Sequence, residues 1–121
     1  MDCRLEVVGV PVSDIDRAKA FYVQVGFVAD HDQRVDETLR FVQLTPVGSG
    51  CSIVLGVTPE MEPGSLHGLI VVVDDIEAAR ADLVERQIEV SEVDDQPWGR
   101  FVYFSDPDGN SWMVQQLPMS A

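Results

Sequence analysis

The stretches VPVSDIDRAKAFYVQVGF, residues 10–27, and VVVDDIEAARADLVERQI, residues 71–88, decide the fold because they repeat one pattern 61 positions apart. Seven aligned pairs of positions hold identical residues: Val10 and Val71, Val12 and Val73, Asp14 and Asp75, Ile15 and Ile76, Ala18 and Ala79, Ala20 and Ala81, Val23 and Val84. The same offset aligns TPVG, residues 45–48, with DPDG, residues 106–109. The chain therefore consists of two related halves.

Each half predicts the same order of elements, a strand followed by a helix and three further strands. Apolar residues at helical spacing form one face in each half: Ile15, Ala18, Tyr22 and Val25, then Ile76, Ala79 and Leu83. Ser13 with Asp16, and Asp74 with Glu77, are predicted to start these helices, and Gly26 to end the first. The predicted strands are residues 5–12, 27–31, 39–45 and 51–57, then residues 66–73, 88–93, 101–105 and 111–117.

This order predicts an α+β fold of two tandem βαβββ modules within a single domain of 121 residues. Module one covers residues 1–57, and module two covers residues 66–121. The segment between them, residues 58–65, is the predicted linker, since it contains Pro59, Pro63 and Gly64.

Two carboxylates, Asp106 and Asp108, stand in the polar turn DPDGN between the last two predicted strands. Proline presets φ in such a turn, aspartate hydrogen-bonds to nearby backbone, and glycine takes a left-handed conformation. We therefore interpret both carboxylates as structural.

The composition narrows the classes of partner. A formal net charge of −13 argues against binding to nucleic acids and to anionic membranes. The N-terminus shows no secretory signal pattern, and no apolar run is long enough to span a bilayer, so we expect a cytoplasmic protein. Cys3 and Cys51 fit neither a disulfide framework nor a CxxC pair, and we expect two free thiols.

The paired modules, together with DIDRAKAFY at residues 14–22 and DPDGN at residues 106–110, resemble the vicinal oxygen chelate superfamily. This superfamily includes glyoxalase I, extradiol dioxygenases, fosfomycin-modifying transferases and bleomycin-binding proteins. The resemblance implies that the two modules form a curved sheet around a cleft, and that two chains pair as a homodimer. Fold alone does not specify which of these functions applies.

Metal enzymes of this family carry His, Glu or Gln ligands on the first and last strands of each module. The matching positions here hold Val7, Ser52 (or Val54 if the turn shifts), Gly68 and Met113. None is a hard ligand for a divalent cation. Glu6 and His67 are the nearest alternatives, one residue out of register and so on the opposite strand face. We therefore expect no metal cofactor.

Strand parity predicts what lines the cleft in place of a metal. In the family's transferases an aromatic hydroxyl points into the site three residues before the turn, and Tyr103 matches that position. The predicted ligand-binding residues are Arg40, Trp98, Phe101, Tyr103, Met113 and Gln115, whereas Trp112 is expected in the core. Such an aromatic pocket suits a planar or hydrophobic small molecule.

Three functions stay open at this stage. The first is a metal-free protein, similar to bleomycin-binding proteins, that binds an apolar or cationic small molecule. The second is an enzyme of lyase, isomerase or dioxygenase type, either metal-free or with ligands outside the family pattern, for which Tyr103 is the candidate acid. The third is a structural or partner-binding role with a cleft that its own side chains fill.

Overall fold

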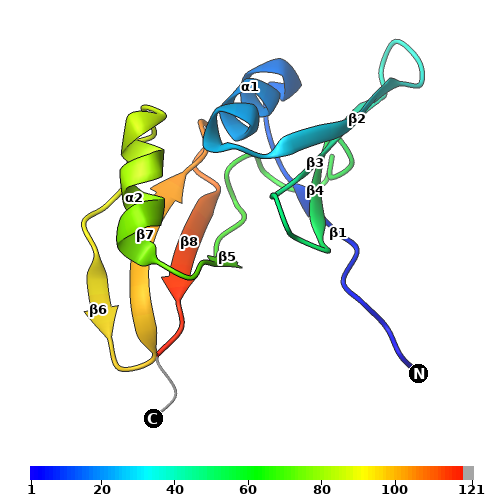
Figure 1. Cartoon of the computed structure of the whole chain (residues 1–121). Helices are drawn as coiled ribbons and strands as arrows, with labels where there is room; N and C mark the ends of the chain where they lie inside the picture. Colours follow the sequence, from blue (N-terminus) through cyan, green and yellow to red (C-terminus); the bar gives the residue numbers. More distant parts are fainter. Residues whose placement is uncertain (119–121) are drawn as a thin grey trace. The chain divides into compact units, whose positions relative to one another are not determined.

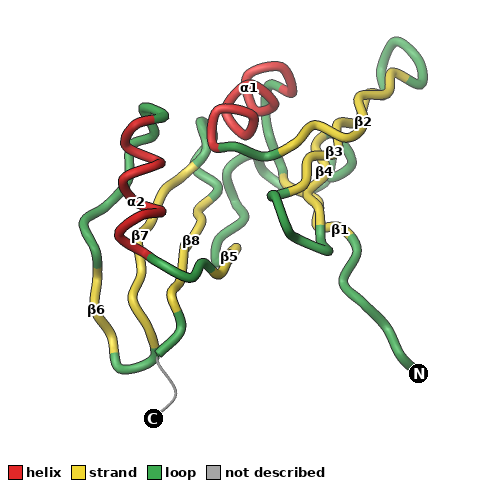
Figure 2. Tube along the Cα trace, in the orientation of Figure 1, coloured by secondary structure: helices red, strands yellow, loops and turns green. Residues whose placement is uncertain are grey.

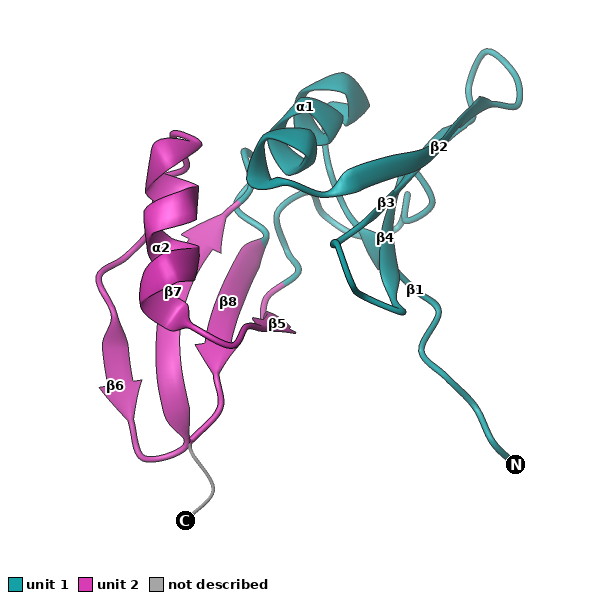
Figure 3. Ribbon diagram, viewed as in Figure 1, with its two compact units in different colours: residues 1–66, 106–110 teal, residues 67–105, 111–121 magenta. Residues whose placement is uncertain are grey.

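The computed structural model describes residues 1–118 and divides the chain into two compact units (Figure 3). Unit 1 comprises residues 1–66 and 106–110, and unit 2 comprises residues 67–105 and the chain from residue 111 onward. Unit 1 contains β1 (Val7–Val10), α1 (Ile15–Val25), β2 (Val28–Arg34), β3 (Arg40–Thr45) and β4 (Ser52–Leu55). Unit 2 contains β5 (Leu69–Val72), α2 (Ile76–Glu85), β6 (Asp94–Gln96), β7 (Gly99–Ser105) and β8 (Ser111–Gln116).

Each unit builds one four-stranded mixed sheet with the same topology (Figures 1 and 2). The strand order is β1-β4-β3-β2 in unit 1 and β5-β8-β7-β6 in unit 2. The first strand of each unit pairs in parallel with the last, and the other pairs are antiparallel. The predicted α+β fold of two βαβββ modules is confirmed.

One face of each sheet is covered by the helix of the same unit. In unit 1, α1 buries Ala18 and Tyr22 against β3, where Val42 and Leu44 are fully buried. In unit 2, α2 contacts β7 and β8, which bury Val102, Phe104, Trp112 and Val114 on one face. Each such large apolar side chain contributes about 1.5–3 kcal/mol when fully buried. The predicted core position of Trp112 is confirmed, with its ring stacked on Phe104 at 5.9 Å between centroids.

Both helices start one residue later than predicted. Asp14 caps α1 by accepting a hydrogen bond from the Arg17 N–H, and Asp75 caps α2 by accepting from the N–H groups of Glu77 and Ala78. The prediction for the end of α1 is confirmed, since Gly26 lies at φ 118° and its N–H donates to the carbonyls of Tyr22 and Val23. Within residues 1–118, no helix combines the length and the apolar character needed to cross a membrane.

The predicted strand over residues 88–93 is wrong, and the strand forms at β6 instead. Only one ordinary ladder bond forms there, from the Ser91 N–H to the Tyr103 carbonyl. The Tyr103 N–H donates to the Ser91 side-chain Oγ, so a side chain replaces the backbone partner that a strand would offer. At the other end of the sequence, β1 stops before Pro11, which has no N–H for the ladder.

Candidate functional site

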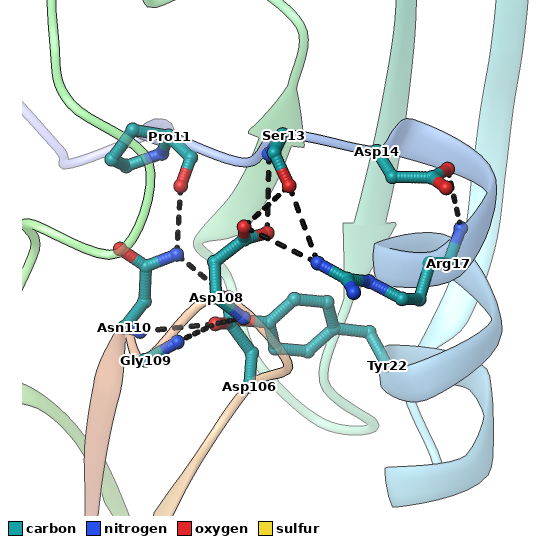
Figure 4. A network of polar contacts seen from close by, with 9 residues as sticks. All are labelled: Pro11, Ser13, Asp14, Arg17, Tyr22, Asp106, Asp108, Gly109 and Asn110. Carbon is teal, nitrogen blue, oxygen red and sulfur yellow. Dashed lines mark hydrogen bonds and ion pairs between the residues drawn. The ribbon is translucent and has the colours of Figure 1, made fainter.

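Asp106 is a structural residue of unit 1, as the sequence predicts (Figure 4). Its Oδ1 accepts hydrogen bonds from the backbone N–H groups of Asp108, Gly109 and Asn110, each at 3.0 Å. Its Oδ2 accepts from the Tyr22 hydroxyl at 2.7 Å and from the Asn110 side chain at 2.7 Å. The carboxylate is 5% exposed, so these five donors replace the water that burial removes.

Asp108 holds the residues that precede α1 (Figure 4). Its carboxylate accepts from the Ser13 N–H at 3.1 Å and from the Ser13 hydroxyl at 2.6 Å. Arg17 adds an ion pair at 3.3 Å. This explains why Ser13 does not cap α1: its hydroxyl is already bound to a carboxylate 95 positions away in the sequence.

The face of the unit 2 sheet that points away from α2 carries most of the predicted ligand-binding residues. Gln116 marks the opposite face, because its side-chain oxygen accepts from the N–H of Ile76 in α2 at 2.8 Å. Strand alternation then turns Met113 and Gln115 away from the helix. Strand register adds their neighbours and defines what we call the aromatic face: Ile70, Val72, Asp94, Phe101, Tyr103, Met113 and Gln115.

The aromatic face has a stacked centre. The rings of Phe101 and Tyr103 are nearly parallel, 4° apart, with centroids separated by 6.2 Å. Phe101 is buried, whereas Tyr103 is 37% exposed and lies opposite Met113 in the ladder. On β5, Ile70 and Val72 are more than half exposed. The predicted grouping of Phe101, Tyr103, Met113 and Gln115 on one face is thus present in the structure, while their contact with a ligand stays a prediction.

A short hydrogen bond joins the Tyr103 hydroxyl to the carboxylate of Asp94, with 2.5 Å between Oη and Oδ2. This bond raises the pKa of Tyr103, and partial burial and the charge of Asp94 act in the same direction. The phenol therefore stays protonated at neutral pH and donates to Asp94. Strands β6 and β7 thus place a hydroxyl–carboxylate hydrogen bond on the aromatic face.

Trp98 lies between β6 and β7, beside the aromatic face, and is 62% exposed. Its carbonyl accepts a hydrogen bond from the Gln115 side-chain amide at 3.1 Å. Gln115 therefore holds the connection that carries Trp98, a role that the sequence pattern did not indicate. The neighbouring Gly99 has φ 149°, and a Cβ there would lie 2.9 Å from the Gln115 amide nitrogen. The Trp98 side chain is thus largely exposed on a connection whose backbone is held by Gln115.

The predicted placement of Arg40 needs correction. Arg40 shares strand parity with the buried Val42 and Leu44, which puts it on the side of β3 that α1 covers. Its guanidinium donates to Asp16 of α1 at 2.6 Å and to both carboxylate oxygens of Asp32. The alignment of module one with module two is therefore out by one residue at this strand, which moves the side chain to the other face.

The charges around Arg40 are strongly coupled. Hydrogen bonds from Arg40, and then from Lys19, hold the pKa of Asp32 far below its usual range. The hydrogen bonds that Arg40 donates to Asp32 and Asp16 raise the pKa of Arg40 itself. This network links α1 with β2 and β3 of unit 1 and gives Arg40 a structural role.

The positions that bear metal ligands in the family do not suit a hard cation here. Val7 pairs with Ser52 across β1 and β4, and Met113 pairs with Ile70 across β8 and β5. These side chains and Gly68 offer no imidazole or carboxylate donor. Among residues 1–118, no three His, Cys, Asp or Glu residues gather as a metal-binding group would require. The absence of a metal cofactor stays a prediction.

Glu6 and His67, the alternative ligands, have other contacts. The Glu6 carbonyl accepts from the Ser52 N–H at 2.9 Å, which continues the β1–β4 ladder by one residue. The His67 Nδ1 lies 2.9 Å from the Ser111 hydroxyl in unit 2. Their proposed use as metal ligands stays untested.

The sequence patterns missed three members of the aromatic face. Asp94 was missed because the predicted strand ended at residue 93, which left this carboxylate outside the sheet. Ile70 and Val72 lie in an unbroken apolar run, LIVVV, which does not reveal that one of its two faces is exposed. The alternation of β5 between half-buried and exposed residues becomes visible only in the structure.

Comparison with known proteins identifies the class to which this fold and these motifs belong. Residues 4–114 match the model of the Glyoxalase/Bleomycin resistance protein/Dioxygenase superfamily, and the chain is a member of that superfamily. No protein with a curated description matches the chain.

Solved structures of similar proteins agree with this assignment. TnmS3, described as an antibiotic binding protein from Streptomyces sp. CB03234, shares 42% identity over 97% of this chain and 98% of its own, with a TM-score of 0.86. A glyoxalase/bleomycin resistance protein from the same organism shares 43% identity over 93% of this chain and 100% of its own, at a TM-score of 0.80. A superfamily member from Sphaerobacter thermophilus DSM 20745 shares 31% identity over 95% and 98%, also at 0.80.

Proposed function

We propose that the protein binds a small organic molecule on the aromatic face of unit 2, without a metal cofactor and without chemical conversion of the ligand. The observation that carries this proposal is the stacked pair of Phe101 and Tyr103, with the exposed side chains of Ile70 and Val72 on the same face of the sheet and the exposed Trp98 on the connection before β7. Exposed apolar side chains that gather on one face of a soluble protein mark surfaces that bind ligands or partners. Aromatic side chains favour ligands that are planar and largely apolar.

The relatives support a binding function. TnmS3, which resembles this chain over nearly its full length, is described as an antibiotic binding protein. A small organic compound with an apolar surface would fit the character of the aromatic face. An apolar or cationic small molecule is the ligand class that we propose.

The test is equilibrium binding of a panel of planar aromatic compounds, followed by mass spectrometry of the recovered compound. We expect at least one compound to bind and to be recovered unchanged. Trp98→Ala should weaken binding, whereas Val84→Ala, an equally simple truncation of a half-exposed residue on α2, should not. Equal effects of the two substitutions, or no binding across the panel, would contradict the proposal.

The metal-free character and the dimeric state are parts of the same proposal. The family's ligand positions, which hold Val7, Ser52, Gly68 and Met113, support the first part. Elemental mass spectrometry of protein purified without an affinity tag should find no stoichiometric zinc, nickel, iron or manganese. Analytical ultracentrifugation should find a homodimer, and a monomer at high concentration would remove that part of the proposal.

One observation favours the alternative, an enzyme of this superfamily of lyase, isomerase or dioxygenase type. The Tyr103 hydroxyl and the Asp94 carboxylate form a coupled pair on the candidate binding face, as a proton-transfer site would require. This alternative predicts that a bound compound is recovered chemically altered. Tyr103→Phe would then abolish conversion while binding persists.

A further inference from the structure

We infer that the aromatic face recognises a planar aromatic cation, and that the carboxylate of Asp94 binds the positively charged group of that ligand. This inference rests on the proposed function and deepens it by naming the charge of the ligand and the residue that binds the charged group. It follows from where Asp94 lies, from what its carboxylate already binds, and from the absence of a competing cation on the described aromatic face.

The position of Asp94 is set by the β6–β7 ladder. Asp94 is the register partner of Phe101, so its side chain projects on the same face as that ring. Tyr103 follows two residues along β7 on the same face and reaches Asp94 with its hydroxyl. The carboxylate therefore stands beside the exposed ring of Tyr103, where a charged substituent of a ligand on that ring would lie.

The carboxylate of Asp94 keeps capacity for a further donor. Its Oδ2 accepts from Tyr103 at 2.5 Å and its Oδ1 accepts from the Gln96 side-chain amide at 2.9 Å. A carboxylate offers about four acceptor sites on its two oxygens. Asp94 is partly exposed, so the remaining sites are open to a ligand. Neither neutral donor cancels its charge.

The polar groups of the aromatic face accept hydrogen bonds more readily than they donate them. The proton of Tyr103 is directed at Asp94, which leaves the phenol oxygen as an acceptor. One amide hydrogen of Gln115 is taken by the Trp98 carbonyl. The faces of the aromatic rings carry negative electrostatic potential, which also attracts cations. A ligand that supplies N–H donors and positive charge complements all of these groups.

The nearest arginine of β7 is directed away from the aromatic face. Arg100 is the register partner of Asp95, one residue out of phase with Asp94 and Phe101. Its guanidinium binds Asp95 at 2.6 Å and Glu77 of α2 at 3.6 Å. Asp95 is thus paired with a cation, whereas the hydrogen-bond partners of Asp94 are neutral.

Matched probes test this inference: acridine, which is neutral at slightly alkaline pH, and 9-aminoacridine, a cation of nearly the same shape there. Fluorescence titration at low ionic strength should show that the wild-type protein binds the cation about tenfold more tightly, since a partly exposed charge pair and cation–π contact act together. Asp94→Asn should remove this preference and leave acridine binding nearly unchanged. Asp95→Asn, which removes the same charge one residue away, should keep the preference.

The outcomes separate the inference from the proposed function. Equal binding of the two probes, with both weakened by Trp98→Ala, would overturn the inference and leave the proposed function intact. Equal loss of preference in Asp94→Asn and Asp95→Asn would also overturn it, because the net charge of −13 would then explain the attraction. Failure of both probes to bind would count against the proposed function as well.

Discussion

At the scale of single residues, Asp106 and Tyr22 show how a carboxylate can be structural rather than catalytic. The acid is buried and accepts five hydrogen bonds, and one of them comes from a hydroxyl on α1. The Tyr22 ring also stacks on Phe27 with centroids 5.5 Å apart. The two tyrosines of the chain therefore differ in role: Tyr22 stabilises the core of unit 1, and Tyr103 stands on the aromatic face of unit 2.

Tyr22→Phe should lower the free energy of unfolding by about 1–3 kcal/mol, because a buried carboxylate loses a donor. Urea denaturation followed by circular dichroism measures this change. Tyr103→Phe is the matched control, since its hydrogen bond is exposed to water, and it should change stability by less than about 0.5 kcal/mol. Equal destabilisation by the two substitutions would contradict the structural role given to Asp106.

The coupling of Tyr103 to Asp94 predicts a late titration of this phenol. Its pKa is raised above the ordinary value of 10.0. The contribution of the pair to stability is therefore present below pH 10.0 and is lost as the pH rises through the higher folded value.

Ultraviolet titration measures this shift directly. The step that disappears in Tyr103→Phe should lie above pH 10.0, and Asp94→Asn should move it down towards that value. If Tyr103 of the wild-type protein titrates at the ordinary tyrosine pKa of 10.0, the hydrogen bond to Asp94 does not form in solution.

At the scale of elements, charged residues join α1 to the strands of unit 1. Asp32 on β2 binds Lys19 of α1 at 2.8 Å and Arg40 of β3 at 2.8 Å. The pKa of Asp32 is lowered by these partners, so its contribution to stability is present above pH 3.8 and is lost as the pH falls through the folded value.

Asp32→Asn should therefore reduce stability at neutral pH, with a deficit that narrows as the pH falls below 3.8. Urea denaturation of the wild-type protein and the variant across this range tests the expectation. Asp2→Asn, at an exposed position near the N-terminus, serves as the control for a general charge effect. A deficit that does not depend on pH would argue that Asp32 acts through packing alone.

The connection between the units contains a glycine that the turn DPDGN requires. Gly64 has φ 81°, and a Cβ there would lie 2.0 Å from the Asp108 carbonyl oxygen. Gly64→Ala should cost more than about 1 kcal/mol, because both the backbone conformation and the space exclude a side chain. Gly50→Ala, where a Cβ meets nothing within 4 Å, should be nearly neutral in the same thermal unfolding experiment.

Element order was predictable from the sequence because the repeat fixes it twice, and helix caps and turns were visible to within a residue. The face of the sheet on which a side chain lies was predictable only where polar and apolar residues alternate clearly along the strand. In β7 and β8 the parity was right, and Phe101, Tyr103, Met113 and Gln115 do share a face. In β3 the offset between modules slipped by one residue and placed Arg40 on the wrong side. The Asp94 carboxylate was missed because the predicted strand ended at residue 93, whereas β6 begins at Asp94.

At the scale of the whole molecule, the two modules share a topology but carry different side chains on the faces that their helices leave uncovered. In unit 1 the register brings together His31 with Gln43, Gln33 with Phe41, and Gln43 with Val54, so that face mixes polar and apolar side chains. Unit 2 carries the stacked rings and the exposed aliphatic residues of the aromatic face. Both copies of the duplicated module have therefore retained the same topology, whereas only unit 2 carries the candidate binding surface.

The measurement that tests this account most directly is a nuclear magnetic resonance titration of isotope-labelled protein with 9-aminoacridine. Binding on the aromatic face should concentrate the backbone chemical-shift changes in unit 2 at Ile70, Val72, Phe101, Tyr103 and Met113, while the signals of His31 and Gln43 in unit 1 change little. Shifts centred on the uncovered face of the unit 1 sheet or on the outer surface of α2, or none at millimolar probe, would contradict the assignment of the aromatic face as the binding site.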